Sequence, residues 1–383
     1  MLLNLCCISA LSGIEANPSQ DIDALIALAE RESALPVDRA VARVSALRGL
    51  IEGIDPHGQY LTADEVVLDR LSSASSRLGL GLDWRWDDAS ALVTRVVPGS
   101  PAALAGLHPG CRIDAVDNVP ASSPRLFAAA FRRGNGSLRL QYRTLDGTPS
   151  DGELQPTAMT DSGLTATDRP ATGILRLRIG RFLPADGTTA GTTTPTFKAF
   201  HRLISEPDTR ACIVDLRGCP GGTLQAAIEI AAGWLPIGAS VIEQVGRDPA
   251  RSRAWRADVP RFPSIPVVVL VDGSTASSGE ILAEALRRVR GAPVVGQPTV
   301  GKWSIQQLFM LAGGDAVQLT VATVRPPGGA PLNSPLQPDV VVAQDQIVTW
   351  TRWRAELTQA SILPPDAQLE RAVRLAQILA TAP

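Results

Sequence analysis

The chain has 383 residues, of which 45% are apolar and 19% charged, and its formal net charge at pH 7 is −2. This length predicts two or three domains with enough chain for a buried core. A nearly neutral chain lacks the basic surface that binds nucleic acid or anionic membranes, so we expect neither partner. No run of 18 apolar residues occurs, so no membrane-spanning helix is predicted.

Cysteine and histidine residues are too few and too scattered to predict a metal site. None of the three histidines lies in an HExxH motif, which argues against a zinc hydrolase. The cysteines show neither metal-ligand spacing nor a disulfide framework. We therefore expect no metal, and we expect three cysteines to be buried as small apolar residues. These are Cys111, Cys212 and Cys219.

The N-terminal part is predicted to be helical. Residues 1–13 are apolar and resemble the h-region of a signal peptide, but the first basic residue is Arg31, so the positive n-region is missing. Residues 1–19 are therefore interpreted as a signal or a disordered start. Apolar residues then recur at three- and four-residue spacing over 20–52, which predicts two helices separated at Pro36. A helical segment is assigned to 20–74.

Residues 77–146 have the pattern of a compact β-rich module. An alternating strand at 91–97 is followed by the turn PGSPA, a short helix at 102–107 and a further strand at 112–119. A polar, helix-like stretch precedes the strand at 137–144. The loop GLGL and the segment VVPGSPAALAGLHPGCRIDAVDN resemble a PDZ domain, which we assign to 75–150. The resemblance implies that the peptide-binding loop consists of Gly79, Leu80, Gly81 and Leu82.

The rest of the chain alternates strands and helices. Residues 147–170 are rich in Thr, Asp and Pro and are predicted to be a linker or loop. The alternation that follows predicts a βαβ core with a largely parallel sheet over 151–345, and a helical C-terminal segment over 346–383. Strands are expected at 173–182, 210–218 and 266–272, and a strand followed by a turn at 293–302. Helices are expected at 194–206, 223–235, 277–291 and 365–379, and a hairpin at 304–311 and 315–324.

Ser277 follows a buried apolar strand and begins a helix. A helix start offers free N–H groups and partial positive charge to a developing oxyanion, so this is a suitable place for a nucleophile. However, Ser277-Ser278-Gly279-Glu280 also fits a capping box, in which Ser277 only caps the helix. Ser274, Thr275 and Ser278 are nearby hydroxyls, and this segment alone does not choose among them.

Lys302 follows a strand and the turn QPTVG. A lysine becomes a base near neutral pH when burial lowers its pKa from the free value of about 10.4. A phosphate-binding role is disfavoured, because the turn lacks the first glycine of a Walker motif and no Ser or Thr follows the lysine. Without further information, a surface lysine remains the alternative.

Residues 274–306, STASSGEILAEALRRVRGAPVVGQPTVGKWSIQ, resemble the catalytic block of the carboxyl-terminal processing (tail-specific) proteases. The family pattern reads SASASE, an apolar helix, then GxxTxGKGxxQ. The resemblance implies that Ser277 is the nucleophile, Lys302 the general base and Gln306 the residue that orients the lysine. Thr275 and Ser278 depart from the pattern, as does Trp303, which stands where glycine is usual.

The segment DLRGCPGG, residues 215–222, resembles the family's DLRxNPGG. An oxyanion hole needs two donors at about 2.7–3.1 Å from the developing charge. One is expected from the N–H of Ser278, and the other from Gly221 or Gly222, where a missing Cβ lets the substrate approach. The family's asparagine is Cys219 here, which either alters the hydrogen bonds of the loop or adds a redox-sensitive thiol.

The resemblance runs from about residue 40 to 345 and implies an α+β multidomain protein. Its ClpP/crotonase-like βαβ core would carry an inserted PDZ domain that also gates the site. The implied function is a serine endopeptidase without cofactor, in the bacterial periplasm or cell envelope. Its implied partners are proteins with exposed C-terminal tails, an activator or adaptor, and further copies of the chain. The alternatives are a catalytically silent PDZ scaffold and a crotonase-like acyl-CoA enzyme, which would not explain the Ser/Lys pair. A His-based triad lacks a histidine near a nucleophile motif.

Overall fold

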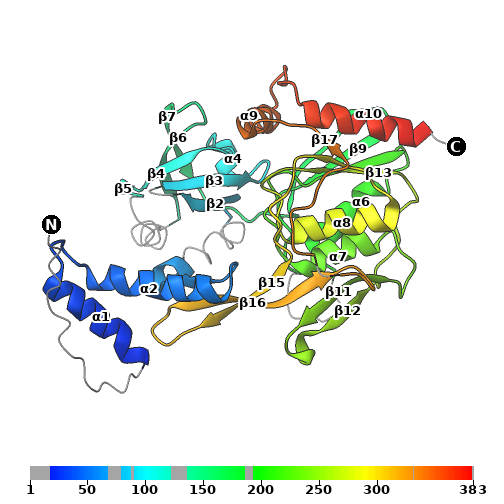
Figure 1. Ribbon diagram of the computed structural model, residues 1–383. Helices are drawn as coiled ribbons and strands as arrows, with labels where there is room; N and C mark the ends of the chain where they lie inside the picture. The colour runs from blue at the N-terminus through cyan, green and yellow to red at the C-terminus, as the bar shows by residue number, and fades with distance from the viewer. Residues whose placement is uncertain are drawn as a thin grey trace, which may run out of the picture.

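The computed structural model describes residues 18–67, 79–87, 90–121, 136–185, 193–330 and 332–381. These residues form three β-sheets with helices packed around them (Figure 1). The apolar segment 1–13 and most of the polar stretch before residue 137 lie outside the described residues. Among the described helices, none is both long and apolar enough to cross a membrane.

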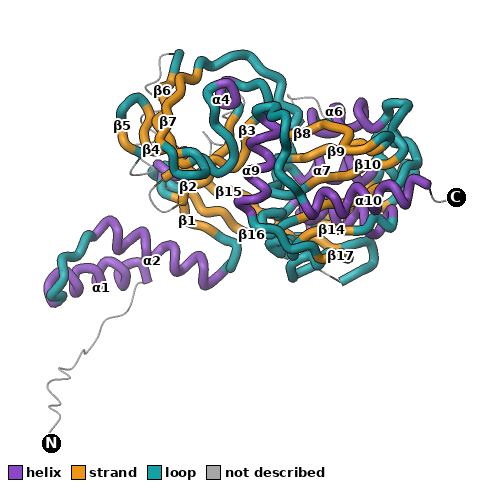
Figure 2. The backbone as a smooth tube through the Cα atoms, turned by 90° about the horizontal axis from the view of Figure 1, so that it is seen from above, coloured by secondary structure: helices purple, strands orange, loops and turns teal. Residues whose placement is uncertain are grey.

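The N-terminal segment contains the two predicted helices. Helix α1 (Pro18–Glu32) and helix α2 (Arg39–Ile54) are separated around Pro36, and Asp38 caps α2 by accepting hydrogen bonds from two backbone N–H groups. No residue of α2 is buried. Both views show α1 at the edge of the molecule, far from the main body (Figures 1 and 2).

The β-rich module predicted over 77–146 forms its own antiparallel sheet in the order β2-β3-β4-β6-β7, with β5 paired to β4. Alternate residues of its strands are buried in a separate apolar cluster around Leu82, Val93 and Leu140. Its elements are β2 (Leu82–Asp87), β3 (Ser90–Val96), α4 (Pro101–Leu104), β4 (Arg112–Val116), β5 (Val119–Pro120), β6 (Leu138–Arg143) and β7 (Pro149–Leu154).

The prediction of a linker or loop over 147–170 is wrong. Strand β7 pairs with β6 over its whole length, and strand β8 (Leu164–Ala171) pairs with β9. The predicted boundary at residue 150 thus falls inside β7. Polar residues suit both strands because each lies at the edge of its sheet with one face toward water.

The core contains the predicted, largely parallel sheet in the order β17-β14-β13-β10-β9-β8, in which only β8 runs antiparallel. Its central strands β10, β13 and β14 are mostly apolar because both faces of the sheet are covered there. Successive residues of β13 illustrate this: Val269 packs with the cluster under α6, α7 and α8, and Leu270 packs against α10 (Figure 1). The strands are β9 (Ile174–Ile179), β10 (Ala211–Asp215), β13 (Val267–Val271), β14 (Val294–Gly296) and β17 (Val340–Val341). The helices are α6 (Pro195–Ile204), α7 (Leu224–Ala232), α8 (Ser278–Arg290) and α10 (Ala367–Thr381).

A third sheet extends from the core toward the N-terminal segment. It contains the predicted hairpin, β15 (Ser304–Met310) with β16 (Ala316–Arg325), and β16 also pairs with β1 (Gln59–Leu61). The sequence did not predict the remaining strands or the 3-10 helix, whereas helix α9 lies in the predicted helical segment 346–383. These elements are β11 (Ser240–Gly246), the 3-10 helix η1 (Pro249–Arg251), β12 (Arg253–Arg256) and α9 (Gln346–Leu357).

Candidate active site

The turn between β13 and α8 holds Ser277 in an unusual backbone conformation. Its φ is +54° and its ψ −120°, whereas an ordinary N-cap residue is extended. The N–H of Ser277 donates to Glu280 Oε2 at 2.9 Å, as a capping box requires. A serine in this region of backbone space is strained by about 1–3 kcal/mol, and such strain gathers at functional sites. A sharp strand-to-helix turn of this kind exposes a nucleophilic serine in other hydrolase folds.

The loop after β10 brings glycine against this turn. A Cβ added to Gly221, whose φ is +105°, would lie 2.9 Å from Ser277 Cβ and 3.1 Å from Ser278 N. Gly221 O accepts from Phe182 N at 3.0 Å, and Gly222 O accepts from Ser278 Oγ at 3.0 Å. Within the described part of the chain, the N–H groups of Gly221 and Gly222 donate to no acceptor. The structure therefore brings together Ser277, Ser278 and free glycine N–H groups.

Asp272 and Thr275 fasten the glycine loop to the serine turn. The buried Asp272 carboxylate accepts from Gly218 N at 3.0 and 3.1 Å and from Ser274 N at 2.9 Å. Thr275 Oγ1 donates to Leu216 O at 2.9 Å. Burial raises the pKa of Asp272 above its ordinary value. These bonds make Asp272 a structural turn carboxylate, and they hold the two loops together.

Cys219 is fully buried in the glycine loop, as predicted, and its backbone O accepts from Ala276 N at 3.0 Å. Cys111 and Cys212 are buried as well. Burial raises the pKa of the Cys219 thiol to about 12, so the thiolate form is scarce at neutral pH. Of the two possibilities raised for this residue, altered hydrogen bonds in the loop or a redox-sensitive thiol, the second is therefore disfavoured.

Glu280 joins the serine turn to the lysine loop, a role that sequence reasoning missed. Its side chain is fully buried and accepts from Gly301 N at 2.6 Å and from Lys302 N at 2.8 Å, besides Ser277 N. Thr299 Oγ1 also donates to it. One carboxylate therefore anchors the backbone of both residues of the expected Ser/Lys pair. The capping-box pattern pointed to the bond with Ser277 but gave no sign of the others.

Lys302 lies in this loop, just before β15, and is half-buried. Burial lowers the pKa of its ammonium group, and the nearby negative charge of Asp55 opposes part of this shift. Among the described residues, Lys302 Nζ has no hydrogen-bond partner, and Ser277 is not in contact with it through a hydrogen bond. The neutral amine that a general base requires is therefore more populated at a given pH than in a free lysine.

Gln306 lies on β15 but does not contact Lys302 through its amide. Its Nε2 donates to His57 O, and its Oε1 accepts from Gln318 Nε2 at 2.9 Å. Asp55 lies two residues before His57 in the chain, and its carboxylate accepts from Thr320 N at 2.6 Å. Burial would raise the pKa of Asp55, but the hydrogen bonds from Thr320 and His57 lower it overall. The N-terminal segment therefore reaches the surroundings of the lysine.

The predicted peptide-binding loop precedes β2 in the β-rich module. Gly79 and Gly81 have φ near +72°, a region that favours glycine, while Leu80 and Leu82 are buried. A Cβ on Gly81 would lie 2.2 Å from Ser100 Cβ, so only glycine fits there. The N–H groups of Leu80 and Gly81 donate to no acceptor in the described part of the chain.

A cavity of about 440 Å³ connects this module with the glycine loop. Its walls include Trp84 and Arg95 from β2 and β3 on one side, and Gly221 and Ala276 from the core on the other. Arg95 is almost fully buried and is paired with Asp83 at 3.1 Å. Among the described residues, no group of three or more His, Cys, Asp or Glu side chains is placed to hold a metal ion.

Comparison with known proteins relates this chain to a family of proteases. The sequence model of "Peptidase family S41" matches residues 172–342, which include the glycine loop, Ser277 and Lys302. A carboxyl-terminal-processing protease of Synechocystis sp. is 30% identical over 359 residues, which cover 91% of this chain and 80% of that protein.

Two solved structures share the fold. One is a photosystem II D1 C-terminal processing protease, with a TM-score of 0.50 and 24% identity over 81% of this chain and 84% of the other. The second is a putative S41 protease from Bacteroides fragilis, with a TM-score of 0.52 and 16% identity over 79% and 82%. This chain belongs to the carboxyl-terminal-processing proteases of peptidase family S41 and is a serine-type peptidase.

Proposed function

We propose that the chain is an endopeptidase in which Ser277 is the nucleophile and Lys302 the general base. The carrying observation is the strained turn at Ser277, which a buried carboxylate, Glu280, ties to the lysine loop. A helix cap needs neither the positive φ nor the link to a lysine. Ser277 Oγ attacks the scissile carbonyl carbon while neutral Lys302 takes the hydroxyl proton. The resulting ammonium gives this proton to the leaving amine, and the peptide C–N bond breaks.

Water then attacks the carbonyl carbon of the acyl-enzyme while Lys302 accepts a proton from the water. The ester C–O bond breaks, Lys302 returns this proton to Ser277 Oγ, and the acid product is released. Every step uses groups of this chain, and no cofactor enters it. Gln306 would orient Lys302. For this, the Gln306 amide must give up its hydrogen bonds to His57 and Gln318 and form one to the lysine. The lowered pKa of Lys302 supports its role as base.

We assign the oxyanion hole to the N–H groups of Ser278 and Gly221. Gly221 is preferred over Gly222 because a Cβ on Gly221 would lie 2.9 Å from Ser277 Cβ, whereas a Cβ on Gly222 would meet the backbone of Phe182. Two such donors, already fixed by Asp272 and the bonds around them, stabilise the charge that develops on the carbonyl oxygen.

The β-rich module is interpreted as a PDZ domain inserted before a crotonase-like core. A C-terminal tail would add to the edge of β2, its carboxylate held by N–H groups of the Gly79–Leu82 loop. The cavity that runs from Trp84 to Gly221 supports this route into the site. We further propose that the chain works with an activator or adaptor protein and with further copies of itself.

We also propose that it acts in the bacterial cell envelope. Fusing its N-terminus to a reporter that is active only after export tests this location.

The rival function is a scaffold of the same fold that binds tails without cutting them. Degradation of unfolded casein separates the two, with wild type beside Ser277→Ala, Lys302→Ala and, as a matched control, Ser274→Ala. We expect cleavage by wild type and the control only, because Ser274 is a neighbouring hydroxyl outside the proposed chemistry. Wild type that binds tail peptides but cuts neither casein nor those peptides would favour the scaffold.

A further inference from the structure

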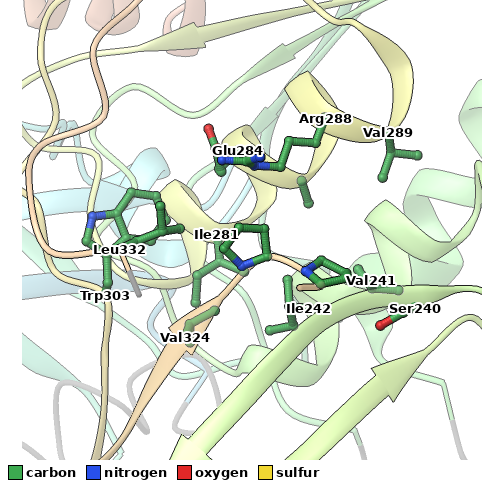
Figure 3. A pocket seen from close by; sticks show the side chains of 13 residues that line it. Ser240, Val241, Ile242, Ile281, Glu284, Arg288, Val289, Trp303, Val324 and Leu332 are labelled. Atoms are coloured by element: carbon green, nitrogen blue, oxygen red, sulfur yellow. Dashed lines mark hydrogen bonds and ion pairs between the residues drawn. The ribbon is translucent and has the colours of Figure 1, made fainter. Parts of the chain in front are cut away.

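The buried tryptophans Trp303 and Trp353 both adjoin a loop of the candidate site. Trp303 directly follows Lys302, but its ring lines an apolar cavity of about 360 Å³ between α8 and the ends of β11 and β16 (Figure 3). No residue of the glycine loop (residues 216–222) lines that cavity. Trp353, on helix α9, packs instead against the glycine loop itself, at Gly218. Of the two rings, only that of Trp353 therefore acts directly on the position of this loop.

The outer edge of the Trp353 indole closes the space beside Gly218. A Cβ added to Gly218, whose φ is +68°, would lie 2.6 Å from Trp353 Cη2 and 2.9 Å from Cζ3, so the ring leaves no room for a side chain. The N–H of Gly218 donates to the Asp272 carboxylate. Gly218 stands three residues before Gly221, the proposed oxyanion donor. The start of the loop that carries this donor is thus held between an aromatic ring and a carboxylate.

The Trp353 ring is itself fixed to the core sheet. It is 5% exposed, and the guanidinium carbon of Arg178 on β9 lies 4.4 Å from its ring centroid, which is a cation–π geometry. Arg178 Nη1 also donates to Glu356 Oε2 at 3.0 Å, three residues further along α9. One arginine of β9 therefore fastens both the ring and the helix that carries it.

A second hold on the glycine loop comes from the residue that precedes α10. Arg217, the fully buried neighbour of Gly218, donates from Nη1 to Asp366 Oδ1 at 2.9 Å. The C-terminal segment thus holds two consecutive residues of the loop, one by an ion pair and one by the ring of Trp353. The two residues that make these contacts lie beyond residue 342, where the match to the family's sequence model ends.

The face of α9 that carries Trp353 also contacts the β-rich module. Trp350, Trp353 and Leu357 are three and four residues apart and so share one face of the helix. A Cβ on Gly110 of the module would lie 2.8 Å from Trp350 Cε3, and Leu357 packs against the module's apolar cluster. Both views place α9 between the module and the core sheet (Figures 1 and 2). A single helix therefore contacts both the module and the glycine loop.

We propose that Trp353 is a positioning residue for the oxyanion hole, which keeps the N–H of Gly221 aimed at the space beside Ser277. It acts through Gly218, from a helix that is braced against the β-rich module. The inference rests on the proposed function, of which the oxyanion hole is part. Trp353 does not line the cavity between the module and the glycine loop, so no contact with substrate is expected. Removing the ring edge should therefore lower kcat and leave KM almost unchanged.

The first test is Trp353→Phe, whose shorter ring can stay beside Arg178 but does not reach Gly218. Trp234→Phe is the matched control, because Trp234 is an equally buried tryptophan that packs on Phe262. Hydrolysis of a fluorogenic peptide and thermal unfolding are measured on the same samples. We expect kcat of Trp353→Phe to fall about 10- to 100-fold with KM within about twofold, and the control to keep kcat within about threefold. An unchanged kcat in Trp353→Phe, an equal loss in the control, or an effect confined to KM would overturn the proposal.

A second test does not depend on hydrolysis. In the Ser277→Ala variant, hydrogen–deuterium exchange is followed by mass spectrometry in a peptide that spans residues 216–222, where the Gly218 amide is hydrogen-bonded. Adding Trp353→Phe should speed exchange in this peptide about tenfold, whereas adding Trp234→Phe should not. Equal exchange with and without the Trp353 ring would overturn the proposal. A wild type that cuts no peptide would reject the peptidase function, and faster exchange in Trp353→Phe would then still show that the ring holds the loop.

Discussion

Replacing Gly221 with alanine should disable the oxyanion hole while the chain remains folded. The new Cβ would lie 2.9 Å from Ser277 Cβ and 3.1 Å from Ala276 O, so the loop must move. Its φ of +105° adds about 1–2 kcal/mol of backbone strain for an L-residue. A displaced donor typically lowers kcat by about 10²–10³, which corresponds to about 3–4 kcal/mol, with a smaller effect on KM.

Gly273→Ala is the matched control, because a Cβ there meets only Pro298 O at 3.9 Å and Gly273 lines the same cavity as Gly221. The assay is steady-state hydrolysis of a fluorogenic peptide, with thermal unfolding measured on the same samples. We expect Gly273→Ala to keep kcat within about threefold of wild type. If Gly221→Ala also did so at unchanged stability, our placement of the oxyanion hole would be refuted.

Three further predictions concern the residues around the Ser/Lys pair. Glu280→Gln keeps the shape of the side chain but leaves some of the N–H groups of Ser277, Gly301 and Lys302 without an acceptor. We therefore expect the free energy of unfolding, measured by denaturation, to fall by about 3 kcal/mol or more. We also expect kcat, measured by steady-state kinetics, to fall. Since Lys302 works as the neutral amine, kcat/KM should rise with pH through its lowered pKa. Asp55→Asn removes a charge that raises this pKa, so the rising limb of the pH profile should move to lower pH; a limb that moves to higher pH would contradict the assignment. The buried Cys219 thiol should resist iodoacetamide at pH 8 in the native protein and react only in denaturant, as peptide mapping would reveal.

The parts of the fold that the sequence predicts well are those with a strong apolar pattern. Strands β10 and β13 are short apolar runs covered on both faces, and α8 ends at Gly291 as its pattern indicates. Strands β7 and β8 escape such reasoning because their Thr, Asp, Pro and Gly residues are typical of loops. They form because β6 and β9 offer partners, with register such as Leu138 opposite Leu154. Local preference is overridden there by tertiary pairing.

The candidate site is likewise predictable from the sequence only in part. Ser277 and Lys302 stand out by motif, but the groups that hold them in place do not. Glu280 reaches the lysine loop, and Asp272 reaches Gly218, only after the strands have brought distant segments to one edge of the sheet. The partners of Gln306 are equally invisible to a motif, because His57 lies in the N-terminal segment.

The central claim is that Ser277, and no neighbouring hydroxyl, is acylated with Lys302 as base. The most direct measurement is mass spectrometry of the protein after a brief reaction with a slowly deacylating p-nitrophenyl ester, followed by peptide mapping. We predict one acyl group on Ser277 in wild type, strongly slowed acylation in Lys302→Ala, and none in Ser277→Ala. An acyl group found on Ser274, Thr275 or Ser278 in the wild type, or formed at the same rate without Lys302, would contradict the mechanism.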